Sequence, residues 1–159
     1  MLEPVFADLD QWVEAYNADV LRDGGQHIRH FEIKVLGQTA LAEMKVELDL
    51  FETQDLDAYV TCGETVKKKL DALLRKVNKR FDFLSHEIWM PKETQYTLVF
   101  ESRHFTVCIA QPEYVLISKA IKSPGKNRPL LLEYLSKNPS KRFFDLAQQY
   151  AFDVEKFLE

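Results

Sequence analysis

Two aspartates separated by one apolar residue form the most restrictive local pattern in this sequence. Asp55 and Asp57 flank Leu56, and apolar residues continue to Val60, which predicts a buried strand. Alternate residues of a strand point to the same face, so the two carboxylates are expected to project together, roughly 6–7 Å apart. This spacing favours a divalent cation such as Mg²⁺, which binds carboxylate oxygens and substrate phosphates. The alternative is a pair of solvated acids at the end of a strand.

Composition places the chain among ordinary soluble globular proteins and predicts one domain over residues 1–159, with 112–159 as a C-terminal helical portion. The net charge of −4 argues against a general nucleic-acid coat but leaves room for a local basic patch. No apolar run approaches the ~20 residues that span a bilayer, and no signal peptide is recognised, so no membrane partner and a cytoplasmic location are expected. Cys62 and Cys108 lack C-x-x-C spacing and are expected to be reduced, buried thiols.

The N-terminal half predicts a helix over residues 4–21, ended by Gly24 and Gly25, and a strand over residues 27–36 that turns at Gly37. A short helix is expected over residues 39–45, with Thr39 as its N-terminal capping residue. The acidic strand follows. A strongly basic amphipathic helix is then expected over residues 64–79, presenting either a solvated face or a surface for phosphates or an acidic partner.

The C-terminal half predicts a strand over residues 81–90 and a hairpin made by residues 96–100 and 105–110. Pro112 is placed to begin a helix that ends before Pro124, and two more helices are expected over residues 128–137 and 141–158, the second bent near residues 152–153. The expected fold class is therefore α/β (α+β), with a mixed sheet flanked by helices.

Three segments in this order are similar to the motifs of one family. Residues 35–41 resemble a turn with a hydrophobic residue, Gly, a small residue and then Thr-Ala-Leu; residues 53–59 resemble the T-x-D-h-D that follows it; and residues 105–120 resemble a late strand and helix carrying a lysine, here Lys119. The ordered set, over about residues 31–135, resembles the nucleotidyltransferase fold of DNA polymerase beta-like enzymes and of minimal nucleotidyltransferases in bacterial toxin–antitoxin and abortive-infection systems.

The resemblance implies a nucleoside triphosphate, ATP or another, as substrate and Mg²⁺ as cofactor. Asp55 and Asp57 are then the expected catalytic and metal-binding residues. The expected contacts to the nucleotide come from Gly37, Gln38, Thr39 and Lys119. Glu101 is the expected third metal ligand, with Asp82 and Glu87 as the other candidates.

The chain also departs from the family pattern. Gln38 replaces the second small residue of the turn, Phe51 replaces a basic residue that often precedes the threonine, and the third carboxylate has no motif. Two further functions therefore stay open: a catalytically inactive protein of the same fold, such as an antitoxin with a toxin-like partner, and a purely structural interaction module. The acceptor of an active form, protein or RNA, and direct nucleic-acid binding are also left open.

Overall fold

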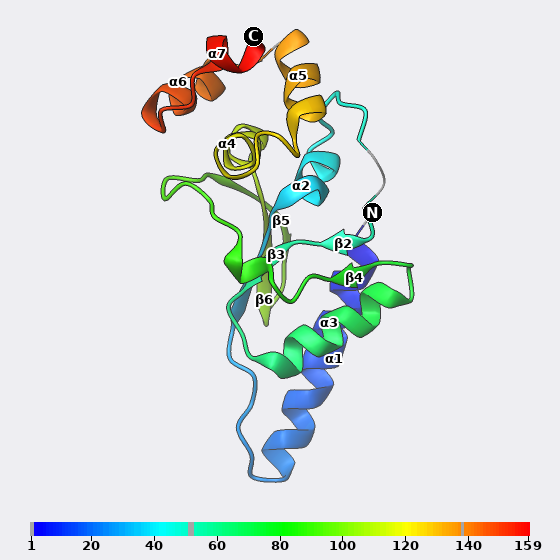
Figure 1. Cartoon of the computed structure of the whole chain (residues 1–159). Coiled ribbons are helices and arrows are strands. Elements are labelled where there is room, and N and C mark those ends of the chain that lie inside the picture. Colours follow the sequence, from blue (N-terminus) through cyan, green and yellow to red (C-terminus); the bar gives the residue numbers. More distant parts are fainter. Residues whose placement is uncertain (1, 51–52, 138) are drawn as a thin grey trace.

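The computed structural model describes residues 2–50, 53–137 and 139–159, and in these it has an α+β architecture (Figure 1). Helices surround a four-stranded mixed sheet and a separate two-stranded ribbon. The fold class expected from the sequence is confirmed. Phe51, one of the departures from the family pattern, lies outside the described residues.

The main sheet has the strand order β3-β1-β6-β5. Its strands are β1 (Phe31–Val35), β3 (Ala58–Val60), β5 (Tyr96–Glu101) and β6 (Phe105–Ala110). β1 pairs antiparallel with β3 and parallel with β6, while β5 and β6 form the expected antiparallel hairpin. Side chains of β1 alternate between buried and more exposed positions, as in a strand with one face on the core.

The acidic segment belongs to two sheets rather than to one strand. β2 (Asp55–Leu56) pairs in parallel with β4 (Arg80–Phe81), whereas β3 joins the main sheet. The chain changes sheet at Asp57, whose carbonyl oxygen accepts a hydrogen bond of 2.7 Å from the backbone N–H of Leu36. This bond ties the crossing point to the end of β1.

Two helices lie side by side below the ribbon, α1 (Glu3–Arg22) and α3 (Glu64–Arg75) (Figure 1). The expected N-terminal helix is confirmed by α1. The ring of Phe6 on α1 lies 5.9 Å from the ring of Phe100 on β5, measured between ring centres. α3 ends before the expected residue 79, because Asn78 adopts a left-handed backbone conformation with φ 60°.

The remaining helices lie at the opposite end of the sheet. α2 (Gly37–Glu43) and α4 (Pro112–Lys122) pack together, with Pro112 in the first turn of α4 as expected. Beyond α4 come α5 (Arg128–Ser136), α6 (Lys141–Gln149) and α7 (Val154–Leu158) (Figure 1). The expected bent helix over residues 141–158 is two helices, because Ala151 interrupts it with φ 57°.

The prediction of a strand over residues 81–90 is wrong. Only Arg80–Phe81 forms a strand, and the chain then turns into the 3₁₀ helix η1 (Ser85–Glu87). The turn results from local bonds: Oδ1 of Asp82 accepts from the Leu84 N–H at 2.9 Å, and the Ser85 hydroxyl donates to the Asp82 carbonyl at 2.6 Å. Asp and Ser side chains that bond to nearby backbone compete with strand formation in this way.

The capping role expected for Thr39 is also wrong. Thr39 lies inside α2, whose N-cap is Leu36, and its side chain is nearly buried. The Thr39 hydroxyl instead donates to the carbonyl oxygen of Asp55 at 3.1 Å. Thr39 therefore fastens α2 to the ribbon.

Both cysteines are free thiols, but Cys62 and Cys108 are half-buried rather than fully buried. The aromatic residues form a more continuous core, in which the rings of Phe31 and Phe105 stack 4.9 Å apart. In the described part of the chain, no helix is both long and apolar enough to cross a membrane.

Asp71 of α3 fixes the position of β4. Its Oδ1 accepts from the Phe81 N–H at 2.9 Å, and its Oδ2 accepts from the Arg75 guanidinium at 2.8 Å. We expect Asp71→Ala to lower the free energy of unfolding by about 2 kcal/mol, because it leaves a partly buried N–H without its charged acceptor. Urea denaturation measures this change. Asp145→Ala, which removes an exposed acid paired with Lys141 at 3.9 Å, serves as the control and should change stability little.

Candidate functional site

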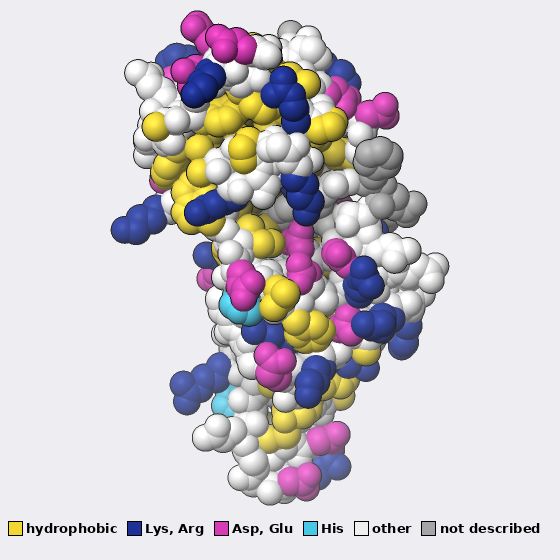
Figure 2. All heavy atoms as spheres, viewed as in Figure 1, with side chains coloured by type: hydrophobic (Ala, Val, Ile, Leu, Met, Phe, Trp, Pro, Cys, Tyr) yellow, Lys and Arg dark blue, Asp and Glu magenta, His cyan; other side chains and the backbone are white. Residues whose placement is uncertain are grey.

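A cleft of about 580 Å³ lies between the turn before α2, the ribbon, the η1 loop and α4. One wall carries carboxylates and the other carries lysines, and the space-filling view shows acidic side chains grouped at mid-height of this face, below basic ones (Figure 2). The acidic residues of the lining are Asp55, Asp57, Asp82 and Glu87. The basic residues are Lys119, Lys122 and Lys126.

The floor of the cleft is the contact between Asp57 and Gly37. Gly37 has φ 63°, in the left-handed region that glycine adopts without steric cost. A Cβ at Gly37 would lie 2.4 Å from Oδ2 of Asp57, closer than van der Waals contact allows. Only glycine therefore satisfies both the backbone conformation and the close approach of the carboxylate.

Asp82 is brought against Asp57 by Ser85. The buried Ser85 hydroxyl accepts a hydrogen bond of 3.0 Å from the Ala58 N–H while it donates to the Asp82 carbonyl. The turn that carries Asp82 is thus fixed next to the residue that follows Asp57. The carboxyl group of Asp82 lies close enough to that of Asp57 to raise the pKa of Asp57.

This pairing changes the protonation of the cleft. The pKa of Asp57 is raised to about 7, chiefly by burial and also by the hydrogen bond and negative charge of Asp82 and the charge of Asp55, while the positive charge of Lys119 counteracts the shift. Asp57 is therefore partly protonated near neutral pH.

Lys119 is the cation that faces this acidic pair from α4. Burial lowers the pKa of Lys119, the charge of Asp57 counteracts that shift, and the nearby Lys126 lowers the pKa further. The charged form of Lys119 is therefore stabilised by a nearby anion. Asp57 provides part of that charge, and an anionic ligand in the cleft would provide more.

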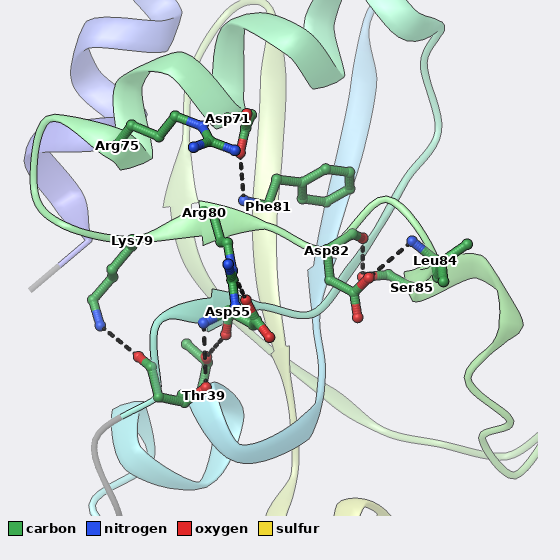
Figure 3. A network of polar contacts seen from close by, with 11 residues as sticks. Thr39, Asp55, Asp71, Arg75, Lys79, Arg80, Phe81, Asp82, Leu84 and Ser85 are labelled. Atoms are coloured by element: carbon green, nitrogen blue, oxygen red, sulfur yellow. Dashed lines mark hydrogen bonds and ion pairs between the residues drawn. The ribbon is translucent and has the colours of Figure 1, made fainter.

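Asp55 has a different environment from Asp57. Its carboxylate forms an ion pair with the guanidinium of Arg80, the neighbouring strand residue of β4 (Figure 3). Its carbonyl oxygen accepts the hydrogen bond from Thr39, also drawn in Figure 3. The Asp55 side chain is half-exposed, so Arg80 can separate from it without leaving a buried charge.

The structure places most of the sequence-predicted site residues together. Asp55, Asp57, Gly37, Gln38 and Lys119 all line the cleft. Thr39 lies beneath it and contacts the backbone of Asp55.

Glu101 does not belong to this cleft, which corrects its expected place as the third acid. Glu101 pairs with Thr106 at the hairpin end of the sheet, near the start of β1, whereas the cleft lies at the far end of β1. Asp82 is the acid that meets Asp57. Its signal in the sequence is the Asp-Phe-Leu-Ser pattern of residues 82–85, which forms an Asp-led turn rather than a strand.

Two residues of the cleft carry the oxygen ligands that a hard divalent cation binds. Asp57 and Asp82 offer carboxylate oxygens, which Mg²⁺ prefers. Oδ1 of Asp55 is engaged by the guanidinium of Arg80, which compensates part of its negative charge. No group of three or more His, Cys, Asp or Glu side chains within residues 2–50, 53–137 and 139–159 is arranged to bind a metal ion.

The basic helix α3 does not present one continuous cationic face. Lys67 pairs with Glu64 at 3.8 Å, and the ammonium group of Lys69 lies 5.9 Å from the ring centre of Trp12. The cations near the end of α3, by contrast, lie beside the ribbon.

Comparison with protein-family models, curated proteins and solved structures gave no match. The resemblance to the nucleotidyltransferase fold therefore stays a prediction from the sequence.

Gly37→Ala should distort the cleft, because the added Cβ collides with the Asp57 carboxylate. Gly24→Ala is the matched control: Gly24 has φ 75°, but a Cβ there meets nothing within 4 Å. Both variants carry backbone strain of about 1–2 kcal/mol, and we expect Gly37→Ala to lose more stability than Gly24→Ala in urea denaturation. Equal losses would contradict the close contact.

Stability should depend on pH through Asp57. Because its folded-state pKa is raised to about 7 from 3.8, the folded protein binds more protons than the unfolded chain between these values. This contribution to stability therefore falls as pH rises from about 4 to 7. Asp82→Asn removes the repelling charge. We therefore expect the free energy of unfolding of the variant, relative to that of the wild type, to rise by on the order of 1 kcal/mol when the pH is raised from 5 to 8.

The measurement is the difference between the urea midpoints of the variant and the wild type at the two pH values. Asp145→Asn removes an exposed acid on α6 and should show a difference independent of pH. A pH-independent difference for Asp82→Asn as well would mean that the two carboxyls do not interact.

Proposed function

We propose that this protein is a minimal nucleotidyltransferase-like enzyme that binds a nucleoside triphosphate with Mg²⁺ in the acidic cleft. The observation that carries the proposal is the Asp57–Asp82 carboxyl pair, placed on Gly37 and facing Lys119. Acids and lysines on opposite walls suit a ligand that contains both a divalent cation and phosphates.

In this proposal Asp57 and Asp82 hold the cation, and Asp55 joins them when Arg80 releases it. When bound, the cation would neutralise part of the negative charge of the phosphates. Lys119 and Lys126 contact the phosphates from the opposite wall, and the backbone at Gly37 allows their close approach. The apolar part of the lining, Ile88, Trp89 and Met90, offers surface for a nucleobase.

The reaction is transfer of a nucleotide to an acceptor hydroxyl. The hydroxyl oxygen forms a bond to the α-phosphorus, the bond from that phosphorus to the pyrophosphate oxygen breaks, and pyrophosphate leaves. The hydroxyl proton leaves to solvent water in the open cleft, because Asp57 and Asp82 hold the cation and stay ionised while it is bound.

The ion pair between Arg80 and Asp55 favours a second candidate function. As long as it stays closed, Arg80 compensates the charge of Asp55, and the cleft attracts a cation less strongly. A protein fixed in this state is a catalytically inactive binding module of the same fold, such as an antitoxin that docks on a toxin-like protein. Nucleotide binding without transfer to any acceptor would support this alternative.

Calorimetric titration with ATP, with and without Mg²⁺, tests the proposal. We expect binding that requires Mg²⁺ and that Asp57→Asn weakens roughly tenfold or more, because the variant lacks a ligand of the cation. Glu101→Gln removes an acid at the far end of the sheet and should bind like the wild type. Mg²⁺-independent binding, or equal binding by Asp57→Asn, would contradict the cleft as the nucleotide site.

A further inference from the structure

One tripeptide, Arg-His-Phe, occurs twice in the chain, at residues 29–31 and 103–105. The two copies lie side by side, because Phe31 and Phe105 are paired in the parallel ladder of β1 and β6, where their rings stack 4.9 Å apart. The Phe31 N–H donates to the carbonyl oxygen of His104 at 3.2 Å, which extends the contact to the residues before the strands. The fold therefore brings two Arg-His pairs to the same edge of the sheet.

These pairs line a pocket of about 640 Å³ at the start of β1, whereas the acidic cleft lies at the end of β1. The basic residues of the lining, which include three of the four histidines in the chain, are His27, Arg29, His30, Arg103 and His104. Glu14 is the one acidic residue among the described residues of the lining. A chain of net charge −4 thus gathers basic side chains at this end of the sheet.

Hydrogen bonds fix both walls of this pocket. Asn17 of α1 bonds both backbone groups of Ile28, accepting from the N–H at 2.6 Å and donating to the carbonyl oxygen at 3.1 Å. The segment between α1 and β1 therefore runs back along the helix (Figure 1). On the opposite wall, Oγ of Ser102 accepts from the N–H groups of His104 and Phe105 at 3.1 and 3.2 Å, which holds the tip of the hairpin.

The positive charge of the pocket is compensated only in part. The Glu14 carboxylate pairs with Nε2 of His104, and this hydrogen bond lowers the pKa of Glu14, as do the charges of His104 and Arg103. Within the described part of the chain, neither Arg29 nor Arg103 forms an ion pair with another side chain. Two guanidinium groups on neighbouring strands repel one another, and a bound anion relieves that repulsion. The pocket therefore favours an anionic ligand.

A phosphate monoester fits these groups better than a carboxylate does. It carries about 1.5 to 2 negative charges at neutral pH and presents three strong acceptor oxygens. A guanidinium donates two parallel N–H bonds to a phosphate, and an imidazole donates in either protonation state. The volume of the pocket is typical of small-molecule sites, and Ala18, Leu21 and Ile28 offer apolar surface for the rest of the ligand.

We propose that this pocket binds a small soluble organic phosphate through Arg29 and Arg103, with His27, His30 and His104 as further donors. The inference does not rest on the proposed function, because the pocket and the acidic cleft have no lining residue in common. A bound phosphate would also link the segment before β1 to the hairpin tip, so the ligand should raise the stability of the folded protein.

Calorimetric titration with phenyl phosphate, in EDTA so that no divalent cation takes part, tests the site. We expect Arg29→Gln with Arg103→Gln to bind roughly tenfold or more weakly than the wild type, because both guanidinium contacts are lost. Lys141→Gln with Lys156→Gln removes the same charge from α6 and α7 and should bind like the wild type. Phenyl sulfate, with the same ring but a single charge, should bind more weakly than phenyl phosphate.

The histidine ring signals in NMR spectra locate the bound phosphate. We expect phenyl phosphate to shift the signals of His27, His30 and His104. His86, which lies on η1 and outside this pocket, is the internal control and should not shift. The Mg²⁺-dependent binding of ATP by the double arginine variant should equal that of the wild type.

Arg29→Gln alone changes an exposed side chain and should give part of the same loss, which separates binding from any effect of the double change on folding. Equal affinity of the arginine variants and the lysine control for phenyl phosphate would overturn the inference. Equal affinity of the wild type for phenyl sulfate and phenyl phosphate would overturn it too. Binding to vesicles that contain phosphatidic acid, without binding of phenyl phosphate, would assign the pocket to a lipid surface and contradict a soluble ligand.

Discussion

The candidate site depends on the close approach of the Asp57 carboxylate to the backbone of Gly37. A side chain at residue 37 would prevent this approach, and the carbonyl of Asp57 bonds to Leu36 of the same turn. The contact defines where the chain leaves the ribbon for the main sheet. Burial and the neighbouring Asp82 raise the pKa of Asp57, and a divalent cation bound between these two carboxylates would lower it again.

The surrounding structure maintains that repulsion. Asp71 fixes β4 to α3, and Ser85 fastens the Asp82 turn to β3, so Asp82 cannot move away from Asp57 without breaking these bonds. Arg80 lies on β4 and forms the ion pair with the Asp55 carboxylate. The ribbon β2–β4 is therefore the element that positions Asp55 and Asp82 at the acidic cleft.

Local patterns in the sequence predicted the elements that depend on short-range forces. The amphipathic pattern of α1, the proline at the start of α4 and the β5–β6 hairpin are examples. The sequence leaves Asp82 as only one of three candidate partners of Asp57, because the contact between them is non-local and the local pattern predicts a strand where the chain turns at residue 82. Likewise, Thr39 bonds to the ribbon instead of capping α2, a choice made by tertiary contacts.

The most direct test of the account is an NMR titration of the carboxyl carbons of Asp57 and Asp82 without and with Mg²⁺. We predict that the Asp57 carboxyl titrates near pH 7 without Mg²⁺ and that Mg²⁺ lowers this pKa, because the cation binds the ionised carboxylate and displaces its proton. Titration of Asp57 near pH 4, unchanged by Mg²⁺, would contradict the proposed cation site.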